Sequence, residues 1–376
     1  MTIVEIIRER GPQTVAAFMD LALYHPHAGY YAGAAQRSGR AGDFFTSVDV
    51  GSLFGELLEV QLAEMAALLT ASPSAPIDLV ESGAGNGRLS ADILRAARHR
   101  DPDFFAAIRL HLVEASEAAR AAQPGTLGEV ADRLVSSSDA LPASFEGVLF
   151  ANELLDALPT HQVVMRDDGL REVYVAADRD RLVAIEGAPS SPALQAYLDR
   201  VGAHLEPGWR AEINLAADDC VREIARRLRR GFVILIDYGH EARDLYSASH
   251  AGGTLTTFAR HMAAGPEVGP DRPAWLERPG EQDITAHVDF TSVRAAAEAE
   301  GLTMLGFLDQ TYFLLGLLQN LSNPEHLSNP SNLQNLSNLK TLVMPGGLGS
   351  TLKVMIFGKG VGTPALSGCS FSVRVT

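Results

Sequence analysis

Cysteine is scarce in this sequence. Only Cys220 and Cys369 occur in 376 residues, and their separation matches no metal-binding spacing. The sequence therefore predicts no metal site, and it favours a reducing compartment or a fold without disulfides.

Basic residues and long apolar runs are also in short supply. The chain has 31 Lys and Arg against 46 Asp and Glu, which gives a net charge of −15 and an isoelectric point near 5.2. Such a surface repels phosphate backbones, so general nucleic-acid binding is disfavoured, although a local basic patch stays open, whereas a basic substrate is tolerated or attracted. No stretch approaches the roughly 20 apolar residues of a membrane span. The N-terminus lacks the pattern of a signal peptide, so we expect a cytoplasmic protein without a membrane span.

Strand-like and helix-like segments alternate from residue 77 onward. Short apolar runs at 77–81, 108–116, 146–152 and 231–239 are typical of buried strands, 133–142 is interpreted as a strand and loop, the third strand in chain order, and 88–100 has the spacing of a helix. This alternation predicts an α/β fold with a mostly parallel sheet and helices on both faces, similar to a Rossmann fold.

Composition shifts divide the chain into five parts. We expect a helical N-terminal cap over 1–75, the first part of the core over 76–160, and an inserted β-containing substrate subdomain over 161–230. The insertion is marked by a hairpin pattern around Asp168-Gly169. Residues 231–360 complete the core and 361–376 form a tail. The Leu-Ser-Asn-rich tract 320–338 is of low complexity and is interpreted as a surface connection.

Three alternating glycines, Gly83, Gly85 and Gly87, follow the first predicted strand, with Glu81 just before them. They are typical either of a tight strand–helix turn or of a turn that lets a cofactor approach bare backbone. Glu114, at the end of the next strand, favours the second interpretation, because a carboxylate there can accept hydrogen bonds from two ribose hydroxyls. A solvated strand end is the alternative for Glu114.

The turn reads G-x-G-x-G rather than the G-x-G-x-x-G of dinucleotide-binding proteins. S-adenosylmethionine (SAM) carries a sulfonium and an ammonium but no phosphate, so nearby carboxylates suit it. Asp139, after the third strand, is placed to meet an adenine amino group or to cap a helix. The order of glycine turn, Glu and Asp resembles a class I SAM-dependent methyltransferase.

Further motifs narrow the resemblance. They occur in the order HPHAGYY, GDFFTS, ESGAGNGRLS, NELLDALP, LIDYGHE, GGTLTTFARH and PGEQDITAHVDF, and LGSTLKVMIFGKG follows near the end. Together they resemble the MidA-like family over about residues 24–290. Mitochondrial members of that family are arginine methyltransferases needed for the assembly of respiratory complex I.

The resemblance implies a class I methyltransferase fold with an inserted substrate domain, SAM as cofactor, and methylation of a protein arginine. It implies cofactor contacts for Glu81, Gly83, Gly85 and Glu114, to which Gly87 adds the third glycine of the turn. It also implies that GDFFTS folds over the cofactor, which brings Gly42, Asp43 and Thr46 near it. The tract 320–338 departs from the helix that the family has there.

Acidic residues after the fourth strand are candidates for binding the methyl acceptor. Asn152, Glu153 and Asp156 lie at its carboxyl end, next to the expected sulfonium. Carboxylates there can orient a guanidinium and stabilise its charge, so we expect Glu153 and Asp156 to be catalytic and Asn152 to contact the cofactor. The alternative is a turn cap for Asp156 and a solvated Glu153.

His287 and Asp289 lie two residues apart, on one face if the chain is extended. His287 can accept a proton or close the substrate pocket, and Asp289 is a catalytic candidate beside it. A structural hydrogen bond is the alternative role for His287.

Three functions stay open: an arginine methyltransferase acting on a respiratory-chain subunit or similar protein, a small-molecule methyltransferase, and a SAM-binding assembly factor without turnover. The acids at 153 and 156 favour a partner with an accessible arginine. The sequence leaves the oligomeric state open, a homodimer included.

Overall fold

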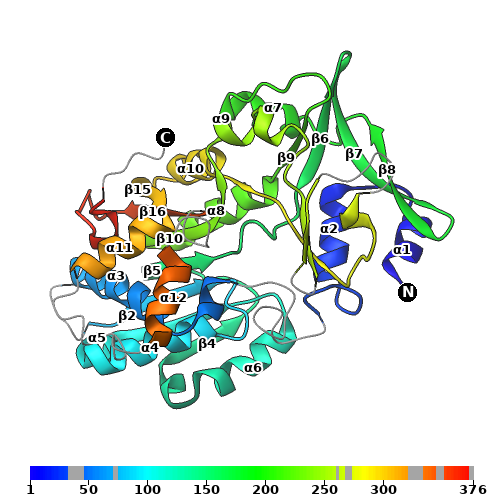
Figure 1. Cartoon of the computed structure of the whole chain (residues 1–376). Helices are drawn as coiled ribbons and strands as arrows, with labels where there is room; N and C mark the ends of the chain where they lie inside the picture. Colours follow the sequence, from blue (N-terminus) through cyan, green and yellow to red (C-terminus); the bar gives the residue numbers. More distant parts are fainter. Residues whose placement is uncertain are drawn as a thin grey trace. The chain divides into compact units, whose positions relative to one another are not determined.

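The structure, a computed structural model (Figure 1), describes residues 1–32, 46–70, 75–259, 262–266, 273–320, 333–343 and 351–371. The chain forms two compact units. Unit 1 comprises Met1–Phe44, Leu155–Val221 and Gly239–Ala296, and unit 2 comprises Phe45–Leu154, Arg222–Tyr238 and Ala297–Thr376. The predicted domain limits do not coincide with this division, because each unit is assembled from separate stretches of chain.

Unit 2 is built on a sheet with the strand order β15-β16-β10-β5-β2-β3-β4. Neighbouring strands from β10 to β4 are parallel, whereas β16 is antiparallel to both β10 and β15. The predicted α/β fold with a mostly parallel sheet is therefore confirmed. The strands are β2 (Ile77–Ser82), β3 (Ile108–Val113), β4 (Leu134–Ser138), β5 (Phe145–Asn152), β10 (Leu228–His240), β15 (Thr303–Asp309) and β16 (Leu352–Lys359).

The strand order reverses direction at β2. The chain runs outward from β2 through β3 to β4, and then returns to the other side of β2 to form β5 and β10. Ligands of open parallel sheets bind at such a switch point, in the crevice outside the carboxyl ends of the strands. The glycine turn follows β2 and the acidic loop follows β5, so the fold places both motifs at this point.

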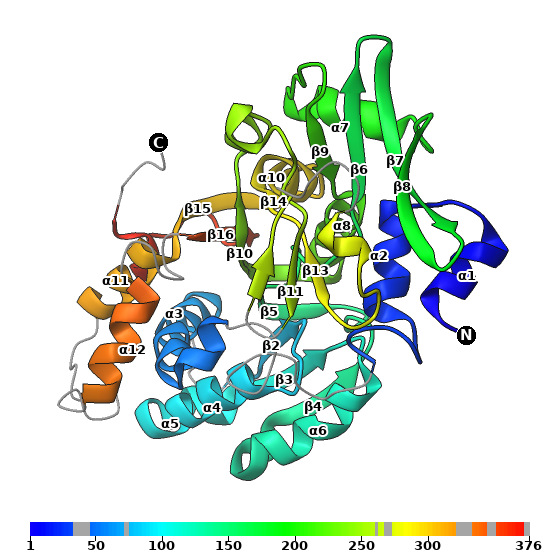
Figure 2. The ribbon, with the colours of Figure 1, turned by 45° about the vertical axis from the view of Figure 1, so that its right-hand side comes forward.

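The helices of unit 2 pack on one another and on the sheet. α3 contacts α4, β5 and α11, and α4 contacts α6 (Figure 2). Leucine, isoleucine and phenylalanine side chains of β2, β3, β5, β10 and β16 pack with these helices into the main core. The helices are α3 (Leu53–Leu69), α4 (Arg88–Arg100), α5 (Pro102–Ala107), α6 (Glu117–Leu127), α11 (Gln310–Asn320) and α12 (Leu333–Val343), with short 3-10 turns η1 (Ser47–Val50), η2 (Gly128–Arg133) and η6 (Ser367–Cys369).

The low-complexity tract 320–338 is only in part a connection. Its last residues, 333–338, belong to α12, which packs against α11, α3 and η1 and buries Leu342 in the core. The interpretation as a surface connection is therefore wrong for this part, because residues 333–338 are helical and continue into the part of α12 that contains Leu342. Residues 321–332 lie outside the described residues.

Unit 1 contains two smaller sheets. One has the order β1-β7-β6-β9 with β8 paired to β7, and the other has the order β12-β11-β13. The predicted hairpin is present: Arg166 pairs with Gly169, so Asp167 and Asp168 form its two-residue turn. The strands are β1 (Gln13–Thr14), β6 (His161–Arg166), β7 (Gly169–Asp178), β8 (Arg181–Gly187), β9 (Arg210–Ile213), β11 (Thr256–Ala259), β12 (Met262–Ala264), β13 (Asp283–Thr285) and β14 (Val288–Asp289), the last paired with the end of β10.

The helices of unit 1 include the two that the N-terminal spacing predicts, with the break at Gly11-Pro12. Gly11 ends the first helix at φ 81°, a conformation that glycine adopts readily. Among the described residues, no helix has the length and apolar character needed to cross a membrane. The helices are α1 (Ile3–Arg10), α2 (Val15–Tyr24), α7 (Ala193–Val201), α9 (Ala242–Leu245), η3 (Ala248–His250) and η4 (Ala274–Leu276), while α8 (Leu215–Arg227) and α10 (Phe290–Ala299) cross the limits of the units.

Candidate active site

The glycine turn has the backbone that its sequence requires. Gly83, Gly85 and Gly87 have φ values of 74°, 50° and 83°, a region that residues with a side chain rarely adopt. A Cβ atom on Gly83 would lie 3.0 Å from Leu154 Cδ1, so Gly83 also allows the loop after β5 to approach the turn. A Cβ atom on Gly85 would meet no atom of the described residues within 4 Å. The turn thus exposes bare backbone to open space at Gly85, as cofactor contact requires.

Glu114 holds the turn from the end of β3. Its Oε2 accepts a hydrogen bond from the Gly85 amide at 2.8 Å, and its Oε1 accepts one from the Ser116 amide at 2.7 Å. Gln123 of α6 supports the same turn by donating to the Gly85 carbonyl at 2.8 Å. Each carboxylate oxygen has a second acceptor direction, so Glu114 can still accept hydroxyl donors.

Glu81 lies beneath the turn. Its side chain is 4% exposed, and its Oε2 accepts a hydrogen bond from the Ser90 hydroxyl of α4. Burial raises the pKa of Glu81 to about 8, and the nearby Glu114 charge acts in the same direction. These contacts tie β2 to the first turns of α4, and they place the carboxyl inside the protein rather than at the open side of the turn.

Asn152 and Glu153 stand at the carboxyl end of β5. Glu153 has φ 52° and its amide donates to the Ile236 carbonyl of β10 at 2.8 Å. Such a backbone is strained for a residue other than glycine, and strain of this kind gathers at functional sites. Asn152 Nδ2 donates to Glu153 Oε1 at 3.1 Å, while Asn152 Oδ1 is buried without a hydrogen-bond partner among the described residues.

Among the described residues, the hydrogen-bond donors to the Glu153 carboxyl are neutral. The donors to its carboxyl are the side-chain amide of Asn152 and the backbone amide of Ser47, at 3.3 Å, and both are neutral. Burial raises the pKa of Glu153 to about 8, and the charges of Asp237 and Asp49 raise it further. The strand end therefore presents a carboxyl group that a cation would stabilise in its ionised form.

Asp237 was not predicted from the sequence, although it lies in the motif LIDYGHE. It is 1% exposed, and its Oδ2 accepts from the Leu154 amide at 3.1 Å. Asp237 thus fixes the backbone just after Glu153 while its charge opposes that of Glu153. The only signal in the sequence is an acid at the end of an apolar strand.

The end of the GDFFTS motif lies close to the same strand end. Thr46 is buried and precedes η1, where its amide and hydroxyl donate to Asp49 at 3.0 and 2.8 Å. Asp49 pairs with Arg88 of α4 at 2.9 Å, and the Ser47 amide reaches Glu153. The structure thus brings Thr46 to the edge that carries the glycine turn. Gly42 and Asp43 lie outside the described residues.

Asp139 follows β4 with an exposed side chain. The chain continues through a bend into β5, so no helix begins there, and the helix-cap alternative is wrong for this residue. The hydrogen bond from the Glu114 amide to the Ser138 carbonyl, at 2.9 Å, keeps the ends of β3 and β4 in register. An adenine contact for Asp139 stays a prediction.

Asp156 belongs to unit 1. Its side chain is 8% exposed, and its carbonyl accepts from the Ala286 amide at 3.0 Å. Asp156 raises the pKa of the buried Tyr31 hydroxyl, as does Asp283, which accepts a hydrogen bond from that hydroxyl at 2.9 Å. Two acids and a tyrosine of the predicted motifs therefore gather in this unit. The predicted packing role of the HPHAGYY aromatics fits the stacking of Tyr24 on Tyr31.

His287 and Asp289 have different surroundings within unit 1. His287 packs beside the rings of His240 and His250, and burial together with these neighbours lowers its pKa to about 4. Asp289 caps α10, because its Oδ1 accepts from the amides of Thr291 and Ser292 at 2.9 and 3.2 Å. Burial raises the pKa of Asp289 to about 6. His287 is thus neutral at pH 7, while the oxygens of Asp289 are used in structural hydrogen bonds.

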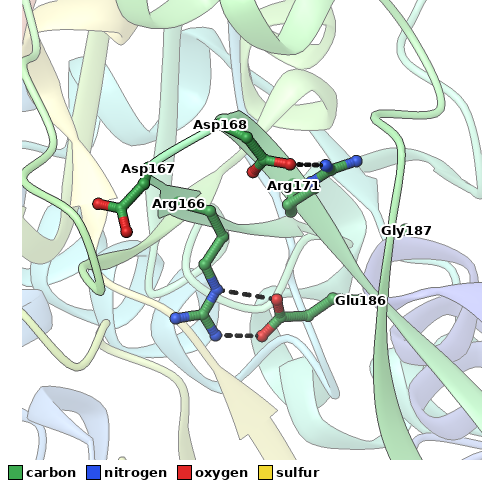
Figure 3. A pocket seen from close by; sticks show the side chains of 6 residues that line it. All are labelled: Arg166, Asp167, Asp168, Arg171, Glu186 and Gly187. Carbon is green, nitrogen blue, oxygen red and sulfur yellow. Dashed lines mark hydrogen bonds and ion pairs between the residues drawn. The ribbon is translucent and has the colours of Figure 1, made fainter.

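A polar cavity of about 430 Å³ lies on the hairpin of unit 1 (Figure 3). Arg166 forms two hydrogen bonds with Glu186, at 2.9 and 2.5 Å, and Arg171 pairs with Asp168. Every lining residue belongs to unit 1, and none is a predicted cofactor residue. We therefore do not place SAM in this cavity.

Comparison with known proteins identifies the family. Residues 57–308 match the Methyltransf_28 family, described as an S-adenosyl-L-methionine-dependent methyltransferase. The chain belongs to this family. It is a SAM-dependent methyltransferase, and the predicted family, enzyme class and cofactor are confirmed.

Curated relatives carry a more specific name. The chain is 31% identical over 337 residues to "Protein arginine methyltransferase NDUFAF7, mitochondrial" of Mus musculus, which covers 82% of this chain and 71% of that protein. The Drosophila melanogaster homologue is 31% identical over 341 residues, with 82% and 72% covered. These names describe the relatives.

A solved structure agrees with the fold over nearly the whole chain. A COG1565 superfamily member from Burkholderia thailandensis, bound to S-adenosyl-homocysteine, aligns with a TM-score of 0.85 and 29% identity and covers 99% of this chain and 95% of its own. This methyltransferase therefore has the fold of a protein that holds the demethylated form of SAM.

The predicted cytoplasmic location is contradicted by the relatives. Those from mouse, fruit fly and human are all named as mitochondrial proteins. The prediction depended on the absence of a signal-peptide pattern and of a membrane span, and neither feature distinguishes one compartment inside the cell from another.

The described residues of unit 2 fit SAM. Bare backbone at Gly85 faces open space, Glu114 retains acceptor capacity for hydroxyl groups, and the orphaned Asn152 Oδ1 is an acceptor suited to a cationic donor such as the ammonium of SAM. When bound, SAM supplies a methyl group activated by the positive sulfonium.

Proposed function

We propose that this methyltransferase modifies the guanidinium group of an arginine in a protein partner. The observation that carries the proposal is the Glu153 carboxyl, held at the carboxyl end of β5 by a left-handed backbone and hydrogen-bonded, within the described part of the chain, to neutral donors. A guanidinium supplies the positive charge that this environment lacks, and its planar donors match a carboxylate. The names of the curated relatives support the same acceptor.

In this proposal, different residues bind the cofactor and the methyl acceptor. Glu114 accepts the ribose hydroxyls, and Asn152 orients the amino-acid end of the cofactor. Glu153, once ionised, accepts N–H hydrogen bonds from the guanidinium and stabilises its charge during transfer. The C–S bond breaks as the C–N bond forms, and the proton released from the attacking nitrogen passes to water or to a carboxylate. Water exclusion and alignment supply the remaining acceleration.

Asp156 is proposed as a second acid for the acceptor. It lies three residues after Glu153 along the chain, in the unit that also contains Tyr31 and Asp283. We assign the inserted region 161–230, of which residues 161–221 belong to unit 1, to acceptor recognition on the same basis. His287 is neutral at pH 7 and is able to accept a proton, whereas the contacts of Asp289 favour a structural role.

For the partner, we propose a chemical feature, an accessible arginine, and no particular protein. An arginine-bearing protein is expected from the relatives' names, and a subunit of respiratory complex I stays a prediction from the MidA-like resemblance. A homodimer also stays a prediction, which light scattering on the purified chain would check.

A labelling experiment tests the acceptor. The purified chain is incubated with methyl-labelled SAM and with matched peptides in which one position is Arg, Lys or His, and a cell lysate is treated in parallel. We expect label in the Arg peptide and in a lysate protein, recovered as methylarginine after acid hydrolysis. Label confined to small molecules would favour a small-molecule methyltransferase, and SAM binding without transfer would favour an assembly factor. Either result would overturn the proposal.

Two substitutions test whether the loop after β5 binds the methyl acceptor. Glu153→Gln and Asp156→Asn preserve size but remove charge, so we expect SAM affinity within a few-fold of the parent and transfer to arginine lower by about 10²–10³-fold for Glu153→Gln. Glu117→Gln, at an exposed position of α6, is the control for the removal of one negative charge elsewhere in the protein. Transfer at the parent rate in both loop variants would show that this loop does not hold the acceptor.

A further inference from the structure

Three histidines that are far apart in the sequence meet in unit 1. His240 ends β10, His250 ends η3, and His287 immediately precedes β14. One ligand-capable atom of each lies within 4.8 Å of the corresponding atoms of the other two. In the part of the chain that the structure describes, this is the one group of three or more His, Cys, Asp or Glu side chains with such a geometry.

The backbone fixes the positions of these three residues. His240 pairs with Asp289 across the parallel contact of β10 with β14, which places His287 at the start of the paired segment. The His287 amide donates to Thr254 Oγ1 at 3.1 Å, and the Gly253 amide donates to the His250 carbonyl at 2.8 Å. The ring centroids are 5.0, 5.4 and 5.8 Å apart, so the three rings face one small volume.

In His250 and His287, the hydrogen-bond contacts leave a ring nitrogen lone pair available to bind a metal ion. His250 Nδ1 lies 3.0 Å from the Asp244 carbonyl oxygen, which can only accept, so Nδ1 carries the proton and the lone pair lies on Nε2. In metal-binding histidines, the ring nitrogen that does not bind the metal usually donates a hydrogen bond to a carbonyl or carboxylate oxygen of this kind. His287 Nδ1 is buried and has no hydrogen-bond partner among the described residues, so a metal ion would satisfy it.

We propose that His240, His250 and His287 bind a zinc ion. Three imidazole ligands suit Zn²⁺ rather than Mg²⁺ or Ca²⁺, which prefer oxygen ligands. Zinc–nitrogen bonds of about 2.0–2.1 Å in a tetrahedral arrangement separate the nitrogens by about 3.3 Å, so side-chain rotations that draw the nitrogens together complete the site. Three protein ligands leave the fourth position to water.

The bound ion would join three segments of unit 1. It links the end of β10 to η3 and to the start of β14, and so closes the stretches 240–250 and 250–287. Metal binding of this kind contributes directly to folding stability, because the unfolded chain does not present the ligands together. Zinc binding here requires neither SAM nor the carboxyl of Glu153, but a His287 nitrogen that binds zinc would no longer be able to accept a proton during methyl transfer.

Metal binding is tested on the full chain after chelation and dialysis. Zn²⁺ is titrated in competition with a chromophoric chelator, and Co²⁺ is added separately to record its visible ligand-field spectrum. We expect one equivalent of tight Zn²⁺, an intense tetrahedral Co²⁺ spectrum, and a melting temperature that rises with Zn²⁺. His250→Gln and His287→Gln should each weaken Zn²⁺ binding at least tenfold.

His204→Gln, at an exposed histidine of the same unit, is the matched control and should bind Zn²⁺ as the parent does. Circular dichroism confirms that each variant is folded. If a cluster variant does not fold, the Co²⁺ spectrum of the parent decides, since its energy and intensity report nitrogen ligation and coordination number. An octahedral spectrum, the absence of stoichiometric Zn²⁺ binding by the parent, or equal affinity in a folded His250→Gln protein would overturn the proposal.

Discussion

Two strand ends at the same edge of the sheet carry carboxyl groups in opposite electrical settings. Glu114, after β3, receives hydrogen bonds from two backbone amides, those of Gly85 and Ser116. Glu153, after β5, receives one amide and one side-chain donor and faces the acids Asp237 and Asp49, so its pKa is raised to about 8. The first carboxylate accepts hydrogen bonds from the turn itself, whereas the residues that the structure describes supply the second with no compensating positive charge.

The difference assigns different ligands to the two ends. A carboxylate already stabilised by amide dipoles can accept further bonds from neutral hydroxyls, such as those of a ribose. A carboxyl beside other acids gains most from a cation, because only a positive charge offsets both its burial and its neighbours. Under the proposed function, charge would separate cofactor recognition at Glu114 from acceptor recognition at Glu153 along one edge of the sheet.

The largest expected effect comes from the turn between these ends. Gly85→Val should abolish measurable SAM binding, because the new side chain would occupy the open space beside the backbone and φ 50° is unfavourable for valine. Calorimetry measures the affinity. Gly128→Val is a matched control, since Gly128 has φ 55° and open surroundings but stands at the far end of α6. Unchanged SAM affinity in folded Gly85→Val would refute the assignment of the turn.

A pH profile sharpens the contrast at Glu153. Its raised pKa means that the group is mostly protonated below about pH 8 and becomes able to pair with a guanidinium as the pH rises. For an arginine peptide, kcat/KM should therefore increase about tenfold between pH 7 and 9, with a midpoint near 8. Arginine does not titrate in this range, so the midpoint belongs to the enzyme.

Glu153→Gln should flatten this profile, and Glu114→Gln should retain it. A profile that keeps its midpoint near 8 in Glu153→Gln would assign the titration to another group, and would leave the raised pKa of Glu153 without a role in transfer.

The sequence predicts the elements that form this edge of the sheet well because they are local. Each strand, turn and helix from residue 77 to 152 is continuous in the chain, and the carboxyl ends of parallel strands necessarily meet at one edge. The positions of Gly85, Glu114 and Glu153 on that edge could therefore be predicted from hydrophobic patterns and from the order of the motifs.

Unit 1 could not be predicted in the same way. It combines three separate stretches of chain, so the pairing of Tyr31 with Asp283 and the histidine cluster depend on contacts that no local pattern encodes. The prediction of no metal site considered cysteine spacing and did not detect histidines up to 47 residues apart. The capping role of Asp289 was also missed, because the start of α10 was not predicted.

A moderate effect is expected at Glu114. Glu114→Ala removes an acceptor for the ribose and frees the Gly85 amide, so SAM affinity should fall by about 1–3 kcal/mol, or roughly 5–150-fold. Glu114→Gln retains one carbonyl acceptor and should lose less. Glu117→Ala, three residues further on in an exposed position, is the control in the same calorimetric titration. If the loss of SAM affinity lies within the measurement error, Glu114 supports the glycine turn but does not bind the ribose.

The smallest effect is expected at the third strand end, where Asp139 is exposed. An exposed carboxylate competes with water for the adenine amino group, so its hydrogen bond contributes only about 0.5–1.5 kcal/mol. Asp139→Ala should therefore weaken SAM binding by about two- to twelvefold. Asp103→Ala, an exposed acid at the start of α5, controls for the change in charge. A SAM analogue without the adenine amino group separates the interpretations: its affinity should be the same for the parent and for Asp139→Ala, since the bond in question is already absent. If the substitution weakens both ligands equally, Asp139 acts through the loop before β5 and the adenine contact is wrong.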